Sequence, residues 1–365
     1  MAFKSFPFPP STPLFPHASA VLTYLRAYAD RGNLRKYINF SSQVSDVKRI
    51  GSKWIVRLNG QKEEEFDFLI VANGHFRLPR YPEPDIPGLQ EWIERGTATH
   101  AYRYRKPPSV LVPNTAKILV IGGGPSGSDI VSDYLGAGYV VVHSVAGSAS
   151  ESVGFCRNRG RVAGFLENSQ VLFESGEIED DVHHCIFATG YQFSFPFLSS
   201  IISPSPFPTC HSPLSDSLPD QIYNSTYHLY PLAKHLFPLQ TGFPPTSRAF
   251  MGLTLRGIPL SLFETQAEAI VKVIADPTSL SIASEVEAIR ARHEQLATIF
   301  GGDEKAIAKN WHKLTEPESF KYRDELNIFY DSSERVEDWE KEMWEQKVLL
   351  RRVWRDLEAG LGKIG

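Results

Sequence analysis

The stretch KILVIGGGPSGSDIV, residues 117–131, decides the fold of this 365-residue chain. An apolar strand at residues 117–121 runs into the glycine pattern GxGxxG and then into a helix. In this pattern Gly122 permits a tight turn, Gly124 lets the backbone approach a pyrophosphate, and Gly127 lets helix and strand pack closely. The stretch therefore predicts the opening of a dinucleotide-binding βαβ unit.

The residues around the turn extend this prediction. A helix from Ser128 to Leu135 and a second strand at residues 138–142 complete the unit. The first N–H groups of the helix would face the phosphates, so no basic side chain is needed there. The alternative, a purely structural glycine turn, is less compatible with this strand and helix context. The residues expected to hold the pyrophosphate are Gly122, Gly124, Pro125, Ser126, Gly127, Ser128 and Asp129.

Composition indicates an ordinary globular protein with room for two domains, because 42% of its residues are hydrophobic and 22% are charged. A net charge of -4 and the lack of a basic run argue against nucleic-acid binding. No apolar run reaches the roughly 18 residues of a membrane helix, and the N-terminus does not resemble a signal peptide. We expect a cytoplasmic protein without a membrane anchor.

The three cysteines, Cys156, Cys185 and Cys210, are far apart in sequence and form no CxxC pair. This spacing argues against a disulfide framework, a zinc site and a redox dithiol, and so against a disulfide reductase. We expect reduced cysteines and no metal site.

Two apolar strands bracket the glycine pattern. Residues 66–72 form a nearly continuous apolar run, which is typical of a strand buried on both faces of a parallel sheet, and Asn73 and Gly74 follow it. Residues 182–188 end in the same way, at Thr189 and Gly190. This arrangement predicts a nucleotide-binding domain inserted into another domain, with Asn73, Gly74 and Gly190 close to a ligand. Two ordinary strand-ending turns are the alternative.

Other segments give weaker patterns. We expect a helix at residues 17–31, a hairpin turning at Asn59 and Gly60, and surface loops over the proline-rich residues 196–245. One charged helix is expected at residues 336–357. Strands are expected at residues 37–44, 47–50 and 53–58, and the buried stripe of the charged helix would comprise Trp339, Met343, Trp344 and Val348.

The chain resembles the flavin-containing monooxygenases over essentially its whole length. The segment ANGHFRLPRYPEPDIPGL, residues 72–89, is similar to the first domain-crossing segment of that family, and residues 188–191 match the second. The family pattern FxGxxxHxxxY is matched by Gly96, His100 and Tyr104, with Glu94 in the phenylalanine position. Related Baeyer-Villiger enzymes carry tryptophan at the position of Tyr104, so the amine or sulfur oxygenase branch is the better match.

The resemblance implies an α/β fold with two Rossmann-like dinucleotide-binding domains. The expected order is a first part of an FAD domain at residues 1–105, an inserted NADP domain at 106–184, a second part of the FAD domain at 185–275, and a helical extension at 276–365. Family members begin with a βαβ unit that binds FAD, and by this resemblance the present sequence starts after that unit. We therefore expect a truncated FAD domain whose parallel sheet has a gap.

The resemblance also implies a reaction. NADPH would reduce FAD, and a flavin hydroperoxide would oxygenate a soft nitrogen or sulfur nucleophile, such as an amine or a thioether, in a water-excluded site. Glu264 and Gln266 would lie near the flavin, and His100 would couple the two domains unless it is only a hydrogen-bonded linker residue. The alternatives are a Baeyer-Villiger enzyme and a non-catalytic remnant that binds NADP.

The end of the second strand bears on the choice of coenzyme. An NAD site would place an acidic residue there, but residues 142–146 contain none. We therefore expect NADP, with Arg157, Arg159 or Arg161 as candidates for binding the 2'-phosphate. The alternative is that these arginines are solvated loop charges.

Overall fold

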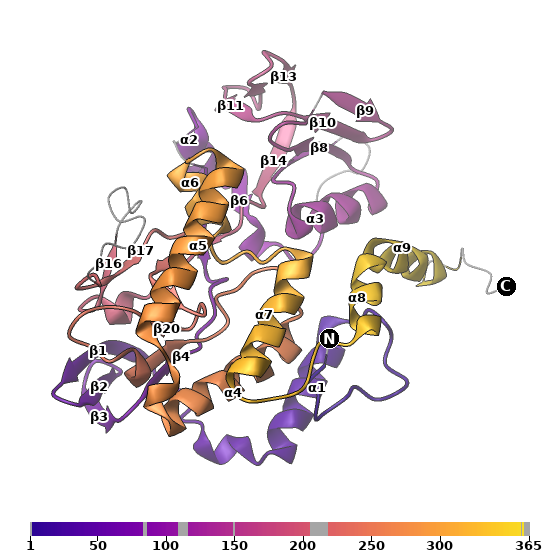
Figure 1. Cartoon of the computed structure of the whole chain (residues 1–365). Helices are drawn as coiled ribbons and strands as arrows, with labels where there is room; N and C mark the ends of the chain where they lie inside the picture. Colours follow the sequence, from indigo (N-terminus) through magenta and orange to yellow (C-terminus); the bar gives the residue numbers. More distant parts are fainter. Residues whose placement is uncertain are drawn as a thin grey trace. The chain divides into compact units, whose positions relative to one another are not determined.

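The computed structural model describes residues 2–82, 86–108, 116–148, 150–204, 218–358 and 360. The chain divides into two compact units, His75–Gln192 and a discontinuous unit made of Met1–Gly74 and Phe193–Gly365 (Figure 1). The α/β fold class is confirmed, and the continuous unit interrupts the sequence of the discontinuous one. The expected NADP domain, residues 106–184, lies within the continuous unit; Cys210 lies outside the described residues.

The continuous unit is built on a six-stranded sheet in which all neighbours are parallel except β9 and β10. Its central strand β7 reads Lys-Ile-Leu-Val-Ile because both faces are covered: Ile118 and Val120 pack toward helix α3, and Leu119 packs toward a small antiparallel sheet. The strand order is β6 (Ala98–His100), β14 (Val182–Phe187), β7 (Lys117–Ile121), β8 (Val140–Ser144), β10 (Cys156–Arg159) and β9 (Glu151–Val153).

The remaining elements of this unit cover the two faces of the sheet. Helix α3 contributes to the hydrophobic cluster on one face, and helix α2 contributes to the cluster on the other together with strands β11 and β12. The bounds are α2 (Leu89–Glu94), α3 (Pro125–Gly136), β11 (Val162–Phe165), β12 (Val171–Phe173), β13 (Ile178–Glu179), β5 (Leu78–Pro79), β15 (Tyr191–Gln192) and the 3-10 helix η2 (Ala101–Arg103).

The discontinuous unit combines small sheets with most of the helices. Strands β1 (Val44–Ile50), β2 (Lys53–Leu58) and β3 (Lys62–Phe66) form an antiparallel sheet, and Asn59 and Gly60 turn between β2 and β3 at φ of 50° and 74°, as predicted. Its helices are α1 (Ala18–Arg31), α4 (Pro259–Ala275), α5 (Ile282–Phe300), α6 (Glu304–Asn310), α7 (Glu316–Phe329), α8 (Asp338–Glu345) and α9 (Lys347–Glu358). None of the helices within the described ranges is both long and apolar enough to cross a membrane.

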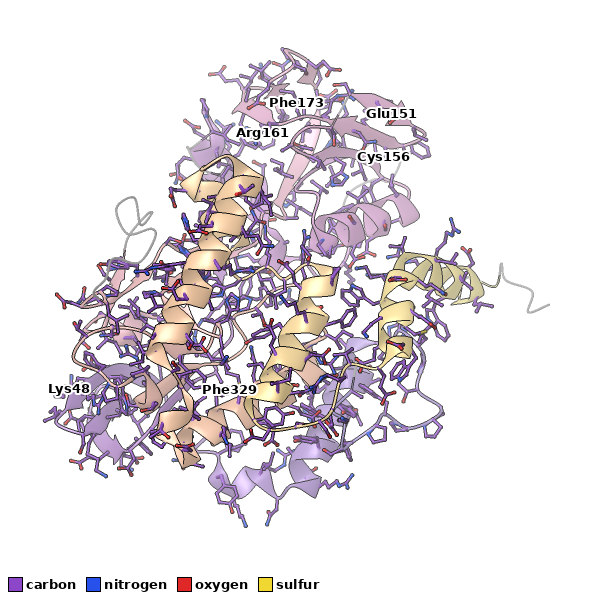
Figure 2. All side chains as sticks on the ribbon, in the orientation of Figure 1. Lys48, Glu151, Cys156, Arg161, Phe173 and Phe329 are labelled. Atoms are coloured by element: carbon purple, nitrogen blue, oxygen red, sulfur yellow. The ribbon has the colours of Figure 1, made fainter. Side chains whose placement is uncertain are left out.

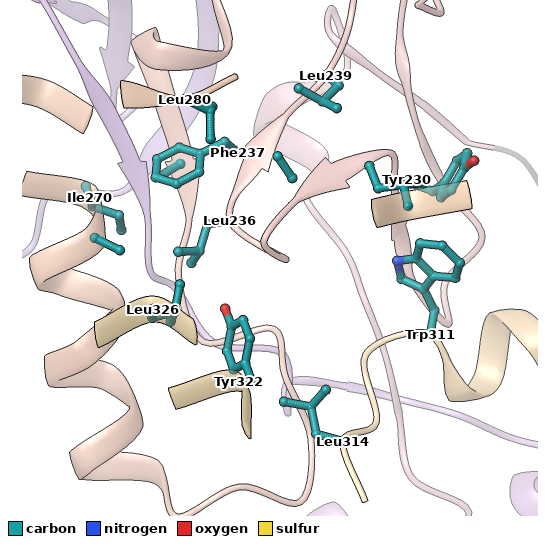
Figure 3. Close-up of a cluster of buried hydrophobic side chains, with 14 of the residues drawn as sticks. Tyr230, Leu236, Phe237, Leu239, Ile270, Leu280, Trp311, Leu314, Tyr322 and Leu326 are labelled. Carbon is teal, nitrogen blue, oxygen red and sulfur yellow. The ribbon is translucent and has the colours of Figure 1, made fainter. Parts of the chain in front are cut away.

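The described parts of the proline-rich segment, residues 196–204 and 218–245, contribute to the core, so the expectation of surface loops there was wrong, and residues 205–217 lie outside the described residues. Leu236 and Phe237 are almost fully buried in one cluster with Ile270 of α4 and Tyr322 of α7, and Tyr230 is buried beside Trp311 (Figure 3). Aromatic and aliphatic residues between the prolines provide this buried surface, in five short strands. These are β16 (Ile202–Pro204), β17 (Ile222–Asn224), β18 (Leu229–Tyr230), β19 (Leu232–Ala233) and β20 (Phe237–Pro238).

Two strand predictions were wrong in their extent. The 3-10 helix η1 (Leu34–Tyr37) replaces the start of the strand expected at residues 37–44, and β1 begins only at Val44. The apolar run at residues 66–72 is split, because Phe66 ends β3 and a separate strand, β4 (Leu69–Val71), pairs in parallel with β21 (Arg248–Phe250). Ile70 is 46% exposed, so this strand is not buried on both faces.

The C-terminal helix prediction also needs correction. The helix expected at residues 336–357 is two helices, α8 and α9, with a break at Gln346. Its expected buried stripe is partly exposed, since Trp339 and Val348 are 59% and 74% exposed. Sequence reasoning missed α7, although a capping box, in which Thr315 and Glu318 bond each other's backbone N–H groups, marks its start.

Three buried imidazoles join the strands of the discontinuous unit to the segment after α6. His312 Nε2 accepts the Leu229 N–H at 3.2 Å, its Nδ1 lies 3.0 Å from His235 Nδ1, and His228 Nδ1 lies 2.5 Å from Ser225 Oγ. Burial lowers the pKa of His228 and of His235 to about 3, and that of His312 well below its ordinary value. All three rings are therefore neutral in the folded protein at neutral pH.

These imidazoles predict acid lability. Below pH 6.5 the unfolded chain binds protons that the folded chain does not, so each imidazole lowers the free energy of unfolding by about 1.4 kcal/mol per pH unit. The measurement is urea unfolding between pH 7.5 and 5.5. In His312→Gln the free energy of unfolding should fall less steeply with decreasing pH, by up to about 1.4 kcal/mol per pH unit. In His17→Gln, a control at an exposed histidine, its pH dependence should match that of the unmodified protein. An equal slope in both variants would contradict the assignment.

Candidate functional site

The glycine turn after β7 has the geometry that its sequence predicts. Gly122 has φ 127°, and a Cβ there would lie 2.4 Å from the Ala188 carbonyl oxygen. A Cβ on Gly127 would lie 1.9 Å from the Gly122 carbonyl oxygen, whereas a Cβ on Gly124 would meet no atom within 4 Å. Gly122 and Gly127 are therefore needed for close packing, and Gly124 faces open space where a phosphate can approach.

Helix α3 presents its N-terminus to this space. Gly124 is its N-cap residue, no side chain caps the helix, and Pro125 occupies the first turn. The first N–H groups are thus left for a ligand, which fits one dinucleotide pyrophosphate. Of the remaining residues expected at the phosphates, Ser126 and Ser128 are exposed and Asp129 is half-buried.

Strand β8 holds the turn from the side. Gly122 donates its N–H to the Ser144 carbonyl at 2.9 Å, and His143 Nε2 lies 3.0 Å from the Gly122 carbonyl oxygen. Both contacts fix the backbone of Gly122, at the end of β7, against β8. After Ser144, residues 145–148 contain no carboxylate, so nothing in this loop matches the acidic residue of an NAD site.

A buried carboxylate on β13 binds basic side chains of β7 and β10. Glu179 is 3% exposed and binds Lys117 Nζ at 2.9 Å, Arg157 at 2.7 Å and Arg159 at 2.6 Å. Burial alone would raise the pKa of Glu179, but the hydrogen bonds and charges of Lys117 and Arg157 hold it below its ordinary value. Arg157 and Arg159 are therefore paired residues of β10 and not solvated loop charges. Sequence reasoning missed Glu179, because its partners are distant in sequence.

The family motif and the second crossing meet within the continuous unit. Gly190 has φ 84° and accepts the Arg80 N–H at 3.0 Å. His100 is 2% exposed and accepts the Tyr102 N–H at Nδ1 (3.0 Å), and burial lowers its pKa against an opposing influence of the Gly190 backbone. His100 is thus a structural neighbour of Gly190.

The other two motif residues also have structural partners. Gly96, at φ 75°, donates to the Ile93 carbonyl at 3.0 Å and so ends α2. Tyr104 donates its hydroxyl to Asp133 of α3 at 3.0 Å. The motif therefore fixes the chain that leads into the sheet onto the helix of the glycine turn.

Four predicted residues lie in the discontinuous unit. Asn73 and Gly74 are exposed at the end of β4, where a ligand can reach them. Glu264 accepts the Lys4 N–H at 2.6 Å, so it holds the N-terminal segment. Gln266 is fully buried and bonds the Gly252 N–H at 3.0 Å and the Tyr322 hydroxyl at 3.2 Å. The side-chain carbonyl oxygen and amide nitrogen of Gln266 thus both have protein partners.

The described residues fit one dinucleotide more clearly than two. In the described ranges, only the turn from Gly122 to Gly127 joins a parallel strand directly to an α-helix. The turns after β4 and β14 leave exposed glycines, Gly74 and Gly190, but no helix N-terminus. Across the same ranges, no three His, Cys, Asp or Glu side chains are placed to hold a metal ion, and Cys156 and Cys185 are free thiols.

Comparison with known proteins gives the family. The family model described as flavin-binding monooxygenase-like matches residues 1–150 and 148–322. The chain is 28% identical to a thiol-specific monooxygenase of Saccharomyces cerevisiae, over 54% of this chain and 47% of that protein. It is 28% identical to flavin-containing monooxygenase FMO GS-OX-like 7 of Arabidopsis thaliana, over 94% of this chain and 71% of that protein. The chain thus spans about half to seven tenths of these relatives.

Solved structures agree on the fold. The structure of S-allyl-L-cysteine S-oxygenase from Allium sativum matches with a TM-score of 0.76 at 24% identity, covering 98% of this chain and 78% of that one. Tmm from Pelagibacter sp. matches with a TM-score of 0.67 at 17% identity, covering 91% and 69%. These matches confirm the expected architecture with Rossmann-like domains.

The three glycines of the turn give separable predictions. Gly127→Ala should lower the free energy of unfolding by about 1–3 kcal/mol, because its Cβ overlaps the Gly122 carbonyl. Gly124→Ala should keep the stability and weaken dinucleotide binding by at least about tenfold. Gly136→Ala, in the same helix and in open space, is the control. The readouts are urea unfolding and coenzyme titration by fluorescence. Equal stability of the first two variants would refute this account.

Glu179→Gln should lower the free energy of unfolding by about 3–5 kcal/mol, because it leaves partly buried cations without their carboxylate. Glu167→Gln, at an exposed carboxylate of the same unit, should change it by less than about 0.5 kcal/mol. Chemical denaturation of both variants measures the difference. A loss below about 1 kcal/mol for Glu179→Gln would show that the cluster is not a stabilising element.

Proposed function

The chain belongs to the flavin-binding monooxygenase-like family, and we propose that it is an FAD- and NADPH-dependent monooxygenase that oxygenates a soft sulfur or nitrogen nucleophile. FAD and NADPH are the cofactors of this family. The observation that carries the proposal is the glycine turn from Gly122 to Gly127 with its uncapped helix N-terminus, in a chain that the family model matches over residues 1–150 and 148–322.

The residues of this chain have defined parts in the proposal. The backbone at Gly124 and the start of α3 bind the coenzyme pyrophosphate, and His143 and Ser144 hold the turn in place. Tyr104, through Asp133, fixes α3, and the buried His100 supports Gly190. FAD, when bound, supplies the oxygen activation that side chains do not provide. Asn73 and Gly74 are exposed at a strand end and are candidates for contact with it.

The names of relatives favour sulfur over nitrogen as the substrate atom. One similar protein is a thiol-specific monooxygenase, and a similar structure is an S-allyl-L-cysteine S-oxygenase. Tyr104 at the motif position, in place of tryptophan, supports the same branch over Baeyer-Villiger chemistry. We therefore place a thioether first and an amine second. The cytoplasm is the location that the sequence predicts.

A second candidate function is coenzyme binding without oxygenation. It is favoured by one observation, that the described residues contain one strand-to-helix glycine turn. The two candidates differ in whether flavin binds and whether NADPH is consumed.

One experiment tests both. The purified protein is mixed with FAD, desalted and examined for flavin absorbance, and then NADPH oxidation and product masses are measured with a thioether, an amine and a cyclic ketone. We expect retained flavin, thioether-dependent NADPH consumption and a product heavier by one oxygen atom. The Gly124→Ala variant should consume NADPH more slowly because its coenzyme site is altered.

Each other outcome has a distinct meaning. NADPH binding without flavin retention or NADPH consumption would replace the proposal with the second candidate. A lactone from the ketone, without a sulfoxide, would assign the chain to Baeyer-Villiger chemistry instead.

A further inference from the structure

Three arginines lie on β10 or directly after it, at Arg157, Arg159 and Arg161. Strand β10 is the parallel neighbour of β8, with Arg159 opposite Ser144. The coenzyme of a Rossmann-like unit lies outside the carboxyl ends of its strands, and its adenosine ribose lies at the end of the second strand, here β8. Strand β10 begins at Cys156 and ends at Arg159, and Figure 2 labels Arg161 on the side of the strand's end that is away from Cys156. Arg159 thus lies at the carboxyl end of the strand next to the expected ribose position, and Arg161 lies beyond that end.

Two of the three are already engaged. Arg157 and Arg159 bind the two carboxylate oxygens of Glu179 at 2.7 and 2.6 Å, and Glu179 is 3% exposed. Moving either guanidinium toward a coenzyme would leave part of this buried carboxylate without its partner, which is costly. Neither arginine is therefore available for a 2'-phosphate without loss of stability.

Arg161 is not bound to Glu179. Its side chain is exposed, and among the described contacts it has no hydrogen bond or ion pair. Only its backbone is fixed, because its carbonyl accepts the Glu174 N–H at 2.9 Å. The exposed side chain of Arg161 is thus carried on an anchored backbone.

The loop after β8 lies against the residue that precedes Arg161. Ser144 Oγ donates to the Gly160 carbonyl at 2.7 Å, and the Val145 N–H donates to the Arg159 carbonyl at 2.9 Å. A Cβ on Gly160 would lie 3.7 Å from the Ser148 carbonyl oxygen. These contacts place the backbone of Arg161 next to the loop of residues 145–148, which contains no acid to repel a phosphate.

We propose that Arg161 binds the 2'-phosphate of NADPH and gives this chain its preference for NADPH over NADH. A guanidinium matches a phosphate through two parallel N–H donors, and the exposed position lets it close on the ligand without breaking another contact. The proposal rests on the proposed function only for the identity of the coenzyme.

The test compares dissociation constants for NADPH and NADH, measured by fluorescence titration of the whole chain without substrate. Arg161→Met should weaken NADPH binding by about 10- to 100-fold and change NADH binding by less than about threefold. Arg161→Lys should recover part of the NADPH affinity, because it keeps the charge and loses the paired donors. Arg95→Met, at another exposed arginine of the same unit, should leave both constants unchanged.

The outcomes that overturn the proposal are specific. Equal weakening of both coenzymes, no change for either, or no binding by the unmodified protein would each refute it. Loss of NADPH preference in Arg157→Met but not in Arg161→Met would assign the phosphate to Arg157 instead. The proposed function is judged separately: selective NADPH binding without NADPH consumption would uphold the role of Arg161 and reject the monooxygenase reaction.

Discussion

The close approach of Gly127 to Gly122 is the constraint on which the candidate site depends. A side chain at Gly127 would overlap the Gly122 carbonyl oxygen, so the first turn of α3 can lie against the end of β7 only because no Cβ is present. The same contact leaves the helix N-terminus beside the turn. Ala188, from the end of β14, encloses Gly122 on another side. Phosphate binding at this turn, as proposed, would depend on backbone geometry and little on the charge of the chain.

Features that depend on neighbouring residues were predictable from the sequence. The glycine turn, the hairpin at Asn59 and Gly60 and the apolar strand β7 each need only a few consecutive residues to specify their conformation. Features that depend on distant partners were not. Glu179 pairs with Lys117, 62 residues away, and no local pattern marks it as buried. The burial of the proline-rich segment similarly depends on packing against α4 and α7.

The two units contain buried polar groups that are stabilised in different ways. In the continuous unit the charge of Glu179 is compensated by three cations, so removal of one partner is expected to be costly. In the discontinuous unit His228, His235 and His312 avoid charge altogether and bond as neutral rings. The first arrangement needs ionised groups and the second excludes them. The imidazoles therefore stay neutral in the folded protein well below the ordinary pKa of histidine, but at such pH the free energy of unfolding falls, because the unfolded chain binds protons that these rings do not.

The family motif has a structural basis that explains its one departure in this chain. Gly96 ends a helix at φ 75°, His100 is enclosed beside Gly190, and Tyr104 binds α3, so each matching residue has a backbone conformation or a contact that another residue type would disturb. Glu94, at the phenylalanine position, is exposed in the last turn of α2 and accepts a hydrogen bond from Gln90 at 2.9 Å. A charged residue is tolerated there because the position does not need to be buried. The motif therefore specifies how the chain enters the sheet of the continuous unit, while the choice of coenzyme is proposed to depend on Arg161, which follows β10.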